Sequence, residues 1–274
     1  MEGSEYDNVC LSVADSINEY IKTDKENFRF YHLLFNHRQQ RYMMALLIEN
    51  LENMEVEDPA NVKKFGRMWW FYYDLHKAHA QVEDNFIHPV LMNSTISSLG
   101  EKNALEPKDV VHMIESQHKS MDETIVLIDQ KTQQMIDADD NETVDTIRNE
   151  LLEIIKSFAI TYHRHVCLEE AKIAPLLHQL DASTQDKVAK EVKDFFQTRA
   201  NGKQMLMAMR DVAISSPEDA EVWNNKMPWF LRNVVMFFLS FDSAYAEYLM
   251  YFPYPHGVNI NEKYKRIVLA QDKK

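Results

Sequence analysis

Histidine and glutamate recur at the same spacing in two short segments of the chain. His79 stands four residues before Glu83 in the first segment, and His165 stands four residues before Glu169 in the second. In both segments an acid follows the glutamate directly, and an isoleucine, a proline and a leucine follow at matching positions. Residues four apart lie on one face of a helix, about 6 Å from each other. Each segment therefore presents an imidazole beside a carboxylate, and two such helices facing each other would form a paired metal site.

The composition favours helices as the elements that position these residues. Five glycines and eight prolines in 274 residues leave little material for the tight turns that many-stranded sheets require. Methionine, leucine, glutamate, lysine and glutamine, which favour helices, are plentiful. The hydrophobic content of 45% is ordinary for a globular protein. We therefore expect an all-α fold.

Apolar residues at helical spacing predict four long helices around the histidines. The expected helices span about residues 28–54, 59–86, 107–136 and 143–174. Asp58 and Pro59 are typical of a helix start, with the aspartate as N-cap. Pro89 is expected to kink or end the second helix and Pro175 to close the fourth, because proline lacks a backbone donor and clashes with the preceding turn. Short connections between the helices predict an antiparallel four-helix bundle.

The first and third helices each carry one histidine, His37 and His118, among aliphatic residues. Taken singly, each is more often a hydrogen-bonded core residue than a ligand. Burying four imidazoles and two carboxylates together, however, costs several kcal/mol per charged group unless they pair or bind metal. The alternative, a surface helix with a hydrogen bond between histidine and glutamate, would also expose the aromatic residues on the same face. We therefore predict a metal site formed by His37, His79, Glu83, His118, His165 and Glu169.

The types of these residues restrict the metal. Imidazole and carboxylate without thiolate suit iron, manganese or zinc, and they match poorly with the all-oxygen shells that calcium and magnesium prefer. Two glutamates from opposite helices can bridge two ions, each of which then keeps two histidines. A bridged pair of metal ions is the expected arrangement.

This pattern resembles the hemerythrin-like (HHE cation-binding) family. The resemblance covers about residues 30–180, and its most specific part is the doubled His-x-x-x-Glu with the downstream proline. The spacing of His37 and Arg41 is also similar to the first helix of that family. The matching positions are His37, His79, Glu83, His118, His165 and Glu169.

The resemblance implies a non-haem di-iron centre in a four-helix bundle. Glu83 and Glu169 would bridge the two iron ions and the four histidines would be terminal ligands, with manganese or zinc as the alternative metals. Family members bind dioxygen, sense oxygen or iron, respond to nitric oxide, or store iron.

One position departs from the oxygen-carrying hemerythrins, which have a second histidine four residues after the one on the third helix. Here the residue four after His118 is Asp122, which counts against oxygen carriage. Asp122 is either a solvated surface acid or a further ligand, and Glu115 and His76 are rival candidates for that place.

Two tyrosines, Tyr72 and Tyr162, lie one or two turns from the ligands on the same helix faces. A phenol there could hydrogen-bond a bound peroxide or a ligand carboxylate. The alternative is a pair of core aromatics whose hydroxyls are satisfied.

The rest of the chain suggests three parts: an amphipathic segment at 1–26, the bundle at 27–180, and a helical extension at 181–274 packed on the bundle. A net charge of −13 counts against nucleic-acid binding, and no apolar run approaches the ~18 residues of a membrane span. Cys10 and Cys167 are far apart, and the first residues do not resemble a signal peptide. We expect a cytoplasmic protein.

Three functions remain open at this point. The first is a di-iron protein that binds dioxygen or another small diatomic or peroxide ligand, as sensor, store or carrier. The second is an oxygenase or peroxidase of the same chemistry, in which the extension, with Trp223 and Trp229, shapes a substrate pocket. The third is a regulatory domain in which iron loading orders the fold and the extension binds a protein partner.

Overall fold

The computed structural model describes residues 30–94, 106–199, 201–215, 217–226, 243–255, 258 and 260–268. Within these residues every regular element is a helix, which confirms the predicted all-α fold. The amphipathic segment expected at 1–26 and the tryptophan at 229 lie outside them. Among the described helices, none combines the length and the apolar character needed to cross a bilayer.

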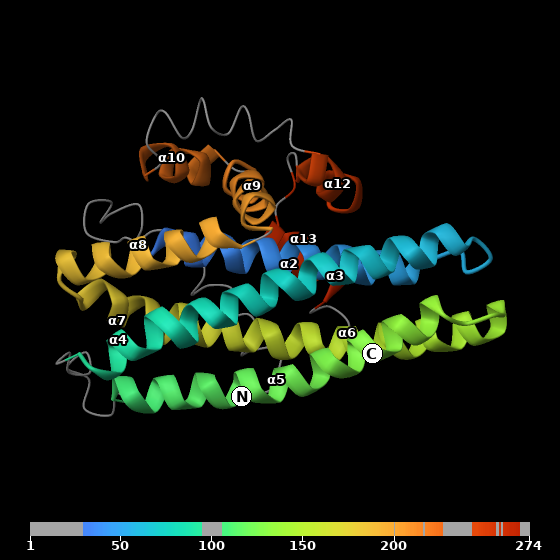
Figure 1. Ribbon diagram of the computed structural model, residues 1–274, viewed down its shortest axis with the longest axis horizontal. Coiled ribbons are helices and arrows are strands. Elements are labelled where there is room, and N and C mark those ends of the chain that lie inside the picture. Colours follow the sequence, from blue (N-terminus) through green and yellow to red (C-terminus); the bar gives the residue numbers. More distant parts are fainter. Residues whose placement is uncertain are drawn as a thin grey trace.

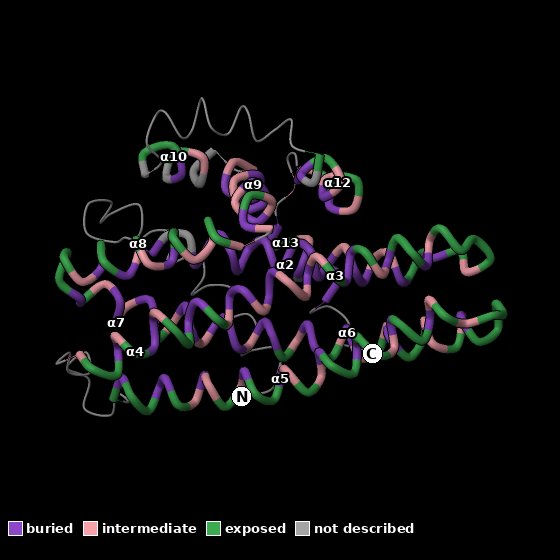
Figure 2. The backbone as a smooth tube through the Cα atoms, in the orientation of Figure 1, coloured by how far each residue is buried: buried purple, intermediate pink, exposed green. Residues whose placement is uncertain are grey.

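The four long helices that carry the histidines pack around one interior. They are α2 (Tyr31–Glu52), α3 (Pro59–Val82), α5 (Pro107–Ile136) and α6 (Asn141–Leu168). Helix α2 contacts α3 and α6, and α5 also contacts α3 and α6. Figure 1 shows these helices side by side, with the turns from α2 to α3 and from α5 to α6 at one end of the molecule. Buried residues follow the sides of the helices that face one another (Figure 2).

Local sequence explains where α3 begins. The side chain of Asp58 accepts a hydrogen bond of 2.9 Å from the backbone N–H of Ala60, and Pro59 is the first helical residue. This arrangement satisfies one free donor of the first turn and places proline where its missing N–H costs nothing. The predicted helix start is confirmed.

Pro175 does not close the fourth helix as predicted, and Pro89 does not end the second, because helical structure continues past both prolines. A π-helical turn, η1 (Glu83–Ile87), follows α3 and leads into α4 (His88–Met92), which contains Pro89. The second copy is the same: η2 (Glu169–Ile173) follows α6 and leads into α7 (Ala174–Gln179).

The π turns explain how the prolines are tolerated. The N–H of His88 bonds to the carbonyl of Glu83, five residues earlier, and the N–H of Ala174 bonds to the carbonyl of Glu169 in the same way. A wider turn with this bonding relieves the clash between a proline ring and the carbonyl four residues before it. The helices therefore continue, and each π turn begins at the glutamate of a His-x-x-x-Glu pair.

The described part of the extension lies against the bundle. Its helices are α8 (Ala182–Thr198), α9 (Gly202–Ala213), α10 (Pro217–Lys226), α12 (Ser243–Tyr251) and α13 (Ile260–Ile267). Helices α9 and α13 contact α2, α12 contacts α3, and α8 contacts η1. The division of the chain at residues 26 and 180 stays a prediction.

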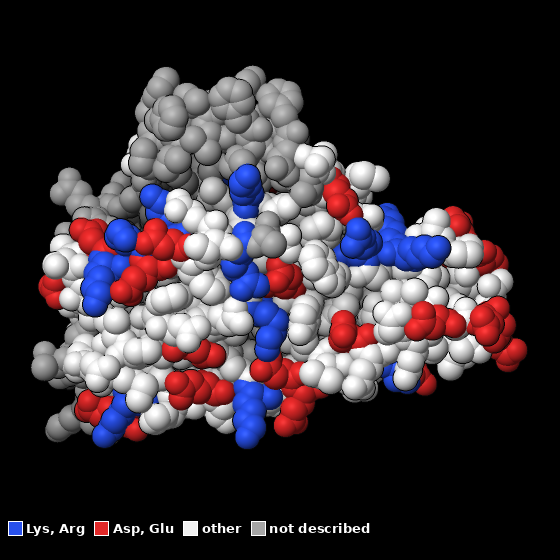
Figure 3. Space-filling model, viewed as in Figure 1, with Lys and Arg blue, Asp and Glu red and all other residues white. Residues whose placement is uncertain are grey.

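On the face shown in Figure 3, lysine and arginine side chains lie among aspartates and glutamates.

Candidate metal centre

The structure brings all six predicted ligands together inside the bundle. Each of these residues is buried, and none is more than 8% exposed. They form two overlapping groups, and in each group one ligand atom per residue lies within 4.8 Å of all the others. The groups are His37, His79, Glu83 and Glu169, and Glu83, His118, His165 and Glu169. The two glutamates belong to both groups and therefore lie between the two pairs of histidines.

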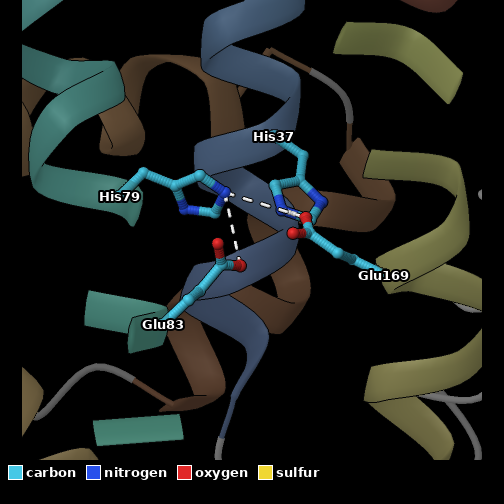
Figure 4. Close-up of side chains that lie close together, drawn as sticks. All are labelled: His37, His79, Glu83 and Glu169. Carbon is cyan, nitrogen blue, oxygen red and sulfur yellow. Dashed lines mark ion pairs between the residues drawn. The ribbon is translucent and has the colours of Figure 1, made fainter. Parts of the chain in front are cut away.

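The first group contains the histidines of α2 and α3 (Figure 4). Nε2 of His37 lies 3.2 Å from Oε2 of Glu169. Nε2 of His79 lies 3.4 Å from Oε1 of Glu83 and 3.8 Å from Oε2 of Glu169. Both imidazoles thus direct Nε2 toward the same two carboxylates.

The second group contains the histidines of α5 and α6. Nε2 of His118 lies 3.3 Å from Oε2 of Glu83 and 3.7 Å from Oε1 of Glu169, and Nε2 of His165 lies 2.9 Å from Oε1 of Glu169. The two Nε2 atoms are 3.1 Å apart. Each glutamate therefore directs one oxygen at one histidine pair and its other oxygen at the other pair, as a bridging carboxylate would.

Several buried polar atoms of the centre make no hydrogen bond within the described residues. They are Nε2 of His37 and of His79, and both carboxylate oxygens of Glu83 and of Glu169. A buried polar atom without a partner costs about 1–3 kcal/mol, and more when the group is charged. Cations placed between the imidazoles and carboxylates would satisfy these atoms, and the mixed nitrogen and oxygen donors suit a transition metal. The residues present therefore fit the metal centre that the sequence predicts.

The electrostatics of the centre also favour positive charge. Burial would lower the pKa of His37, but the close carboxylates of Glu169 and Glu170, the second of which is hydrogen-bonded to Nδ1, outweigh it and raise that pKa to about 9. Burial would likewise raise the pKa of Glu169, yet the surrounding histidines, His165 foremost, lower it well below its usual value. The carboxylate of Glu169 is therefore ionised, and a proton on His37 contributes to balancing its charge when no metal does.

Residues outside the six hold three of the imidazole rings in place. Nδ1 of His37 donates to Oε1 of Glu170 at 2.9 Å. In the same way, Nδ1 of His165 donates to Oε1 of Gln117 at 2.9 Å, and Nδ1 of His118 donates to a carboxylate of η1, Oδ1 of Asp84, at 3.2 Å. A hydrogen bond at Nδ1 fixes the ring so that Nε2 faces the centre.

Sequence reasoning missed these three partners. Asp84 and Glu170 occupy the same place in the two repeated segments, directly after the glutamate, so the recurring acid was the available signal. Gln117, directly before His118, lies in neither repeated segment, so no recurring residue indicated it.

Arg41 anchors Glu170 from α2. Its Nη1 donates to Oε1 at 3.0 Å and its Nη2 donates to Oε2 at 3.1 Å, and both side chains are at most 2% exposed. Burial would raise the pKa of Glu170, but Arg41 and then His37 outweigh it and lower that pKa to about 2. Glu170 is thus an ionised, fully buried link between an arginine and a histidine ligand.

The three rival candidates for further ligands lie outside both groups found in the described residues. Asp122 accepts from Nζ of Lys77 at 2.9 Å and is 48% exposed, which fits a surface acid. Glu115 lies at the surface, where its carboxylate is 3.9 Å from Nδ1 of His88 and 3.3 Å from Nδ1 of His112, one turn before it on α5. His76 lies against Gln40, with 3.1 Å between Nδ1 and Oε1.

Tyr72 and Tyr162 are fully buried, and neither hydroxyl has a hydrogen-bond partner within the described residues. Both rings contact that of His76, with centroids 5.9 Å (Tyr72) and 5.7 Å (Tyr162) from the imidazole. Burial raises the pKa of both phenols well above 10, and the charges of Glu169 and Glu83 add to this effect at Tyr162. Within the described residues, neither hydroxyl is satisfied, so the alternative of satisfied core aromatics is not borne out there, and both phenols remain protonated.

Comparison with known proteins adds one finding. A family model described as the hemerythrin HHE cation binding domain matches residues 30–177, which is more than half of the 274 residues. The search of curated proteins found no match, and neither did the search of solved structures. The matched range contains α2, α3, α5 and α6 and all six residues of the centre.

Proposed function

We propose that this chain, which belongs to the hemerythrin HHE cation-binding domain family, holds two non-haem iron ions and binds dioxygen or a related small ligand. Glu83 and Glu169 would bridge the ions. The histidines of α2 and α3 would ligate one ion, and those of α5 and α6 would ligate the other. The observation that supports this arrangement is that each glutamate directs one oxygen toward each histidine pair.

The number of protein donors favours a small-ligand site over a purely structural one. Two histidine nitrogens and two carboxylate oxygens would be offered to each ion, fewer donors than iron commonly takes, so room for a small ligand would remain. Bound iron would supply reversible electron transfer toward dioxygen and related molecules. The protein would hold the imidazoles through their Nδ1 hydrogen bonds and exclude bulk water by burying the centre. Sensing, storage and carriage of oxygen or iron are the roles consistent with such a site.

Metal analysis tests this proposal directly. Protein prepared without metal, reconstituted anaerobically with ferrous iron and then desalted should retain two irons per chain. Glu169→Ala should lose most of this iron, because it removes the group that both ions would share, whereas Glu123→Gln, a change at an exposed residue of α5, should retain all of it. A wild-type chain that stays metal-free after reconstitution, or that holds only zinc, would refute the proposal.

The two unpaired phenols favour one second candidate, a peroxidase-type or oxygenase-type enzyme. The hydroxyls of Tyr72 and Tyr162 are available to donate to an oxygen-containing ligand beside the centre. An enzyme of this kind would oxidise a phenolic reductant with hydrogen peroxide repeatedly, and Tyr162→Phe would slow this turnover. A sensor or carrier would instead give a stable spectral change in air and no turnover, so the two candidates are distinguishable in the same iron-loaded sample.

A further inference from the structure

Helix α13 docks on the bundle through a buried tyrosine. It packs against α2, the helix that carries His37 (Figure 1). The side chain of Tyr264 is fully buried, and its hydroxyl donates to the backbone carbonyl of Ala159 on α6 at 2.5 Å. At the edge of the same contact, Nζ of Lys263 pairs with a carboxylate oxygen of Glu49 on α2 at 2.5 Å. A helix of eight residues is marginal in water by itself, so α13 is helical when it is docked and unfolds when it is released.

Buried side chains connect Tyr264 to Arg41. The ring of Tyr264 contacts that of His163 on α6, with centroids 5.5 Å apart. Four residues further along α6, Sγ of Cys167 lies 3.7 Å from Nε2 of His163. The same sulfur accepts a hydrogen bond from Nη2 of Arg41 on α2 at 3.8 Å. None of these four residues is more than 2% exposed, so solvent does not interrupt the contacts.

Arg41 is the point where these contacts reach the centre. Its guanidinium holds Glu170, and Glu170 accepts from Nδ1 of His37. On the other side of the same ring, Nε2 of His37 faces the carboxylate of Glu169, and neither that nitrogen nor that carboxylate has a hydrogen-bond partner within the described residues. A cation between them would restrain the ring of His37, and through it Glu170 and Arg41. The contacts together are called the buried path, which consists of Tyr264, His163, Cys167, Arg41, Glu170 and His37.

Metal binding and the docking of α13 therefore restrain the same side chains. Ordering a long, buried side chain such as that of Arg41 costs conformational entropy. The event that comes first incurs this cost, and the second event is then more favourable, which is positive coupling without a change of overall structure. Such coupling is reciprocal, so docked α13 must strengthen metal binding by the factor by which metal strengthens docking.

We propose that α13 is a latch, which docks on the bundle more tightly when the centre holds metal ions and is released more readily when the centre is empty. The buried path carries this coupling, since one of its ends belongs to α13 and the other to the centre. The latch rests on the proposed function in one respect, because the centre must take up metal. It requires neither iron nor dioxygen, so any cation that the centre retains tests it.

Hydrogen exchange followed by mass spectrometry measures the docking of α13. Full-length metal-free protein and the same protein loaded with Co²⁺ without oxygen are compared at the backbone amides of α13. The loaded protein should exchange these amides about tenfold more slowly, a factor typical of coupling between two sites of one protein. Equal exchange in protein that retains Co²⁺ would overturn the latch alone. Protein that retains neither Co²⁺ nor iron would refute the proposed function, and the latch with it.

Cys167→Ala tests the buried path, because it removes the sulfur between Arg41 and His163 and leaves the six residues of the centre in place. Ser157→Ala is the matched control, since it removes one heteroatom from an exposed position of the same helix. Both variants should retain Co²⁺. The effect of Co²⁺ on the exchange of α13 should fall below about twofold in Cys167→Ala and stay about tenfold in Ser157→Ala. An effect of the wild-type size in Cys167→Ala would overturn the path.

Reciprocity gives an independent test, since undocked α13 must weaken metal binding. Tyr264→Ala removes the buried side chain of the latch, and Arg266→Lys is the control, because it keeps the charge at a side chain of α13 that is 75% exposed. In competition titrations, Tyr264→Ala should bind Co²⁺ about tenfold more weakly than wild type, and the control should bind it equally. Wild-type affinity in Tyr264→Ala protein whose α13 amides exchange freely would overturn the latch.

A milder variant keeps this test independent of how well Tyr264→Ala folds. Tyr264→Phe removes only the hydroxyl that donates to Ala159 and keeps the ring beside His163. It should accelerate the exchange of α13 and weaken Co²⁺ binding together, both by less than Tyr264→Ala does. Faster exchange of α13 with unchanged Co²⁺ affinity would count against the coupling.

Discussion

Replacing Glu170 by glutamine should strongly destabilise the metal-free protein. The carboxylate of Glu170 bonds to Arg41 and His37, and all three side chains are almost fully buried. The fall of its pKa from 4.5 to about 2 in the folded state corresponds to roughly 3 kcal/mol of folding free energy. Loss of one partner from a buried ion pair costs about 3–5 kcal/mol, because the remaining charge stays buried without compensation. We therefore expect Glu170→Gln to lower the free energy of unfolding by about 3 kcal/mol at pH 7.

Urea unfolding of metal-free protein, followed by circular dichroism, measures this difference. Because the pKa of Glu170 is depressed in the folded state, its contribution is fully present above pH 4.5 and is lost as the pH falls toward 2. The gap between variant and wild type should therefore narrow at pH 3. Glu123→Gln, at an exposed position, should change stability by less than about 0.5 kcal/mol. A loss below about 1 kcal/mol for Glu170→Gln at pH 7 would refute the reasoning.

Three further predictions concern single groups. Burial raises the pKa of Asp211 to about 6 despite the hydrogen bond from Tyr245, so ionising Asp211 costs folding stability as the pH rises from 4 through 6. In urea titrations, Asp211→Asn should therefore raise the free energy of unfolding by about 1–2 kcal/mol at pH 8 and by less at pH 4. Tyr72→Phe removes a buried hydroxyl that has no hydrogen-bond partner within the described residues, so unfolding should show unchanged or higher stability, and a loss above about 1 kcal/mol would contradict this. Asp84→Asn removes the carboxylate that orients His118, so competition titrations with Co²⁺ should show affinity at the centre about 10–100-fold weaker, and wild-type affinity would exclude that role.

Apolar periodicity and capping residues were enough to predict the bundle helices. Helix α3 begins at Pro59, as predicted from Asp58 and Pro59, because a helix start depends on local hydrogen bonding that neighbouring residues supply. The continuation past Pro89 was not predictable in the same way. A proline signals that the α-helical bond pattern fails, but whether the chain then stops or widens into a π turn depends on how the whole bundle packs.

The six residues of the centre were predictable for a similar reason. Their spacing places them on the inward faces of four helices, and any bundle of these helices brings such faces together. The partners of their Nδ1 atoms depend on which helices are neighbours and on the axial register between them, and apolar periodicity determines neither. Glu170 reaches His37 on α2, and Asp84 reaches His118 on α5, so each acid serves a histidine of another helix.

The two halves of the repeat differ in charge at the residue four positions after the lone histidine. On α2 this residue is Arg41, which neutralises Glu170 and allows that acid to be buried. On α5 it is Asp122, which has the wrong charge to neutralise Asp84 and pairs with Lys77 instead. Without a guanidinium, Asp84 pairs within the described residues only with the imidazoles of His118 and His88, and it stays half exposed. A single difference in charge therefore accounts for two acids at matching positions of the repeat lying in different environments, Glu170 fully buried and Asp84 half exposed.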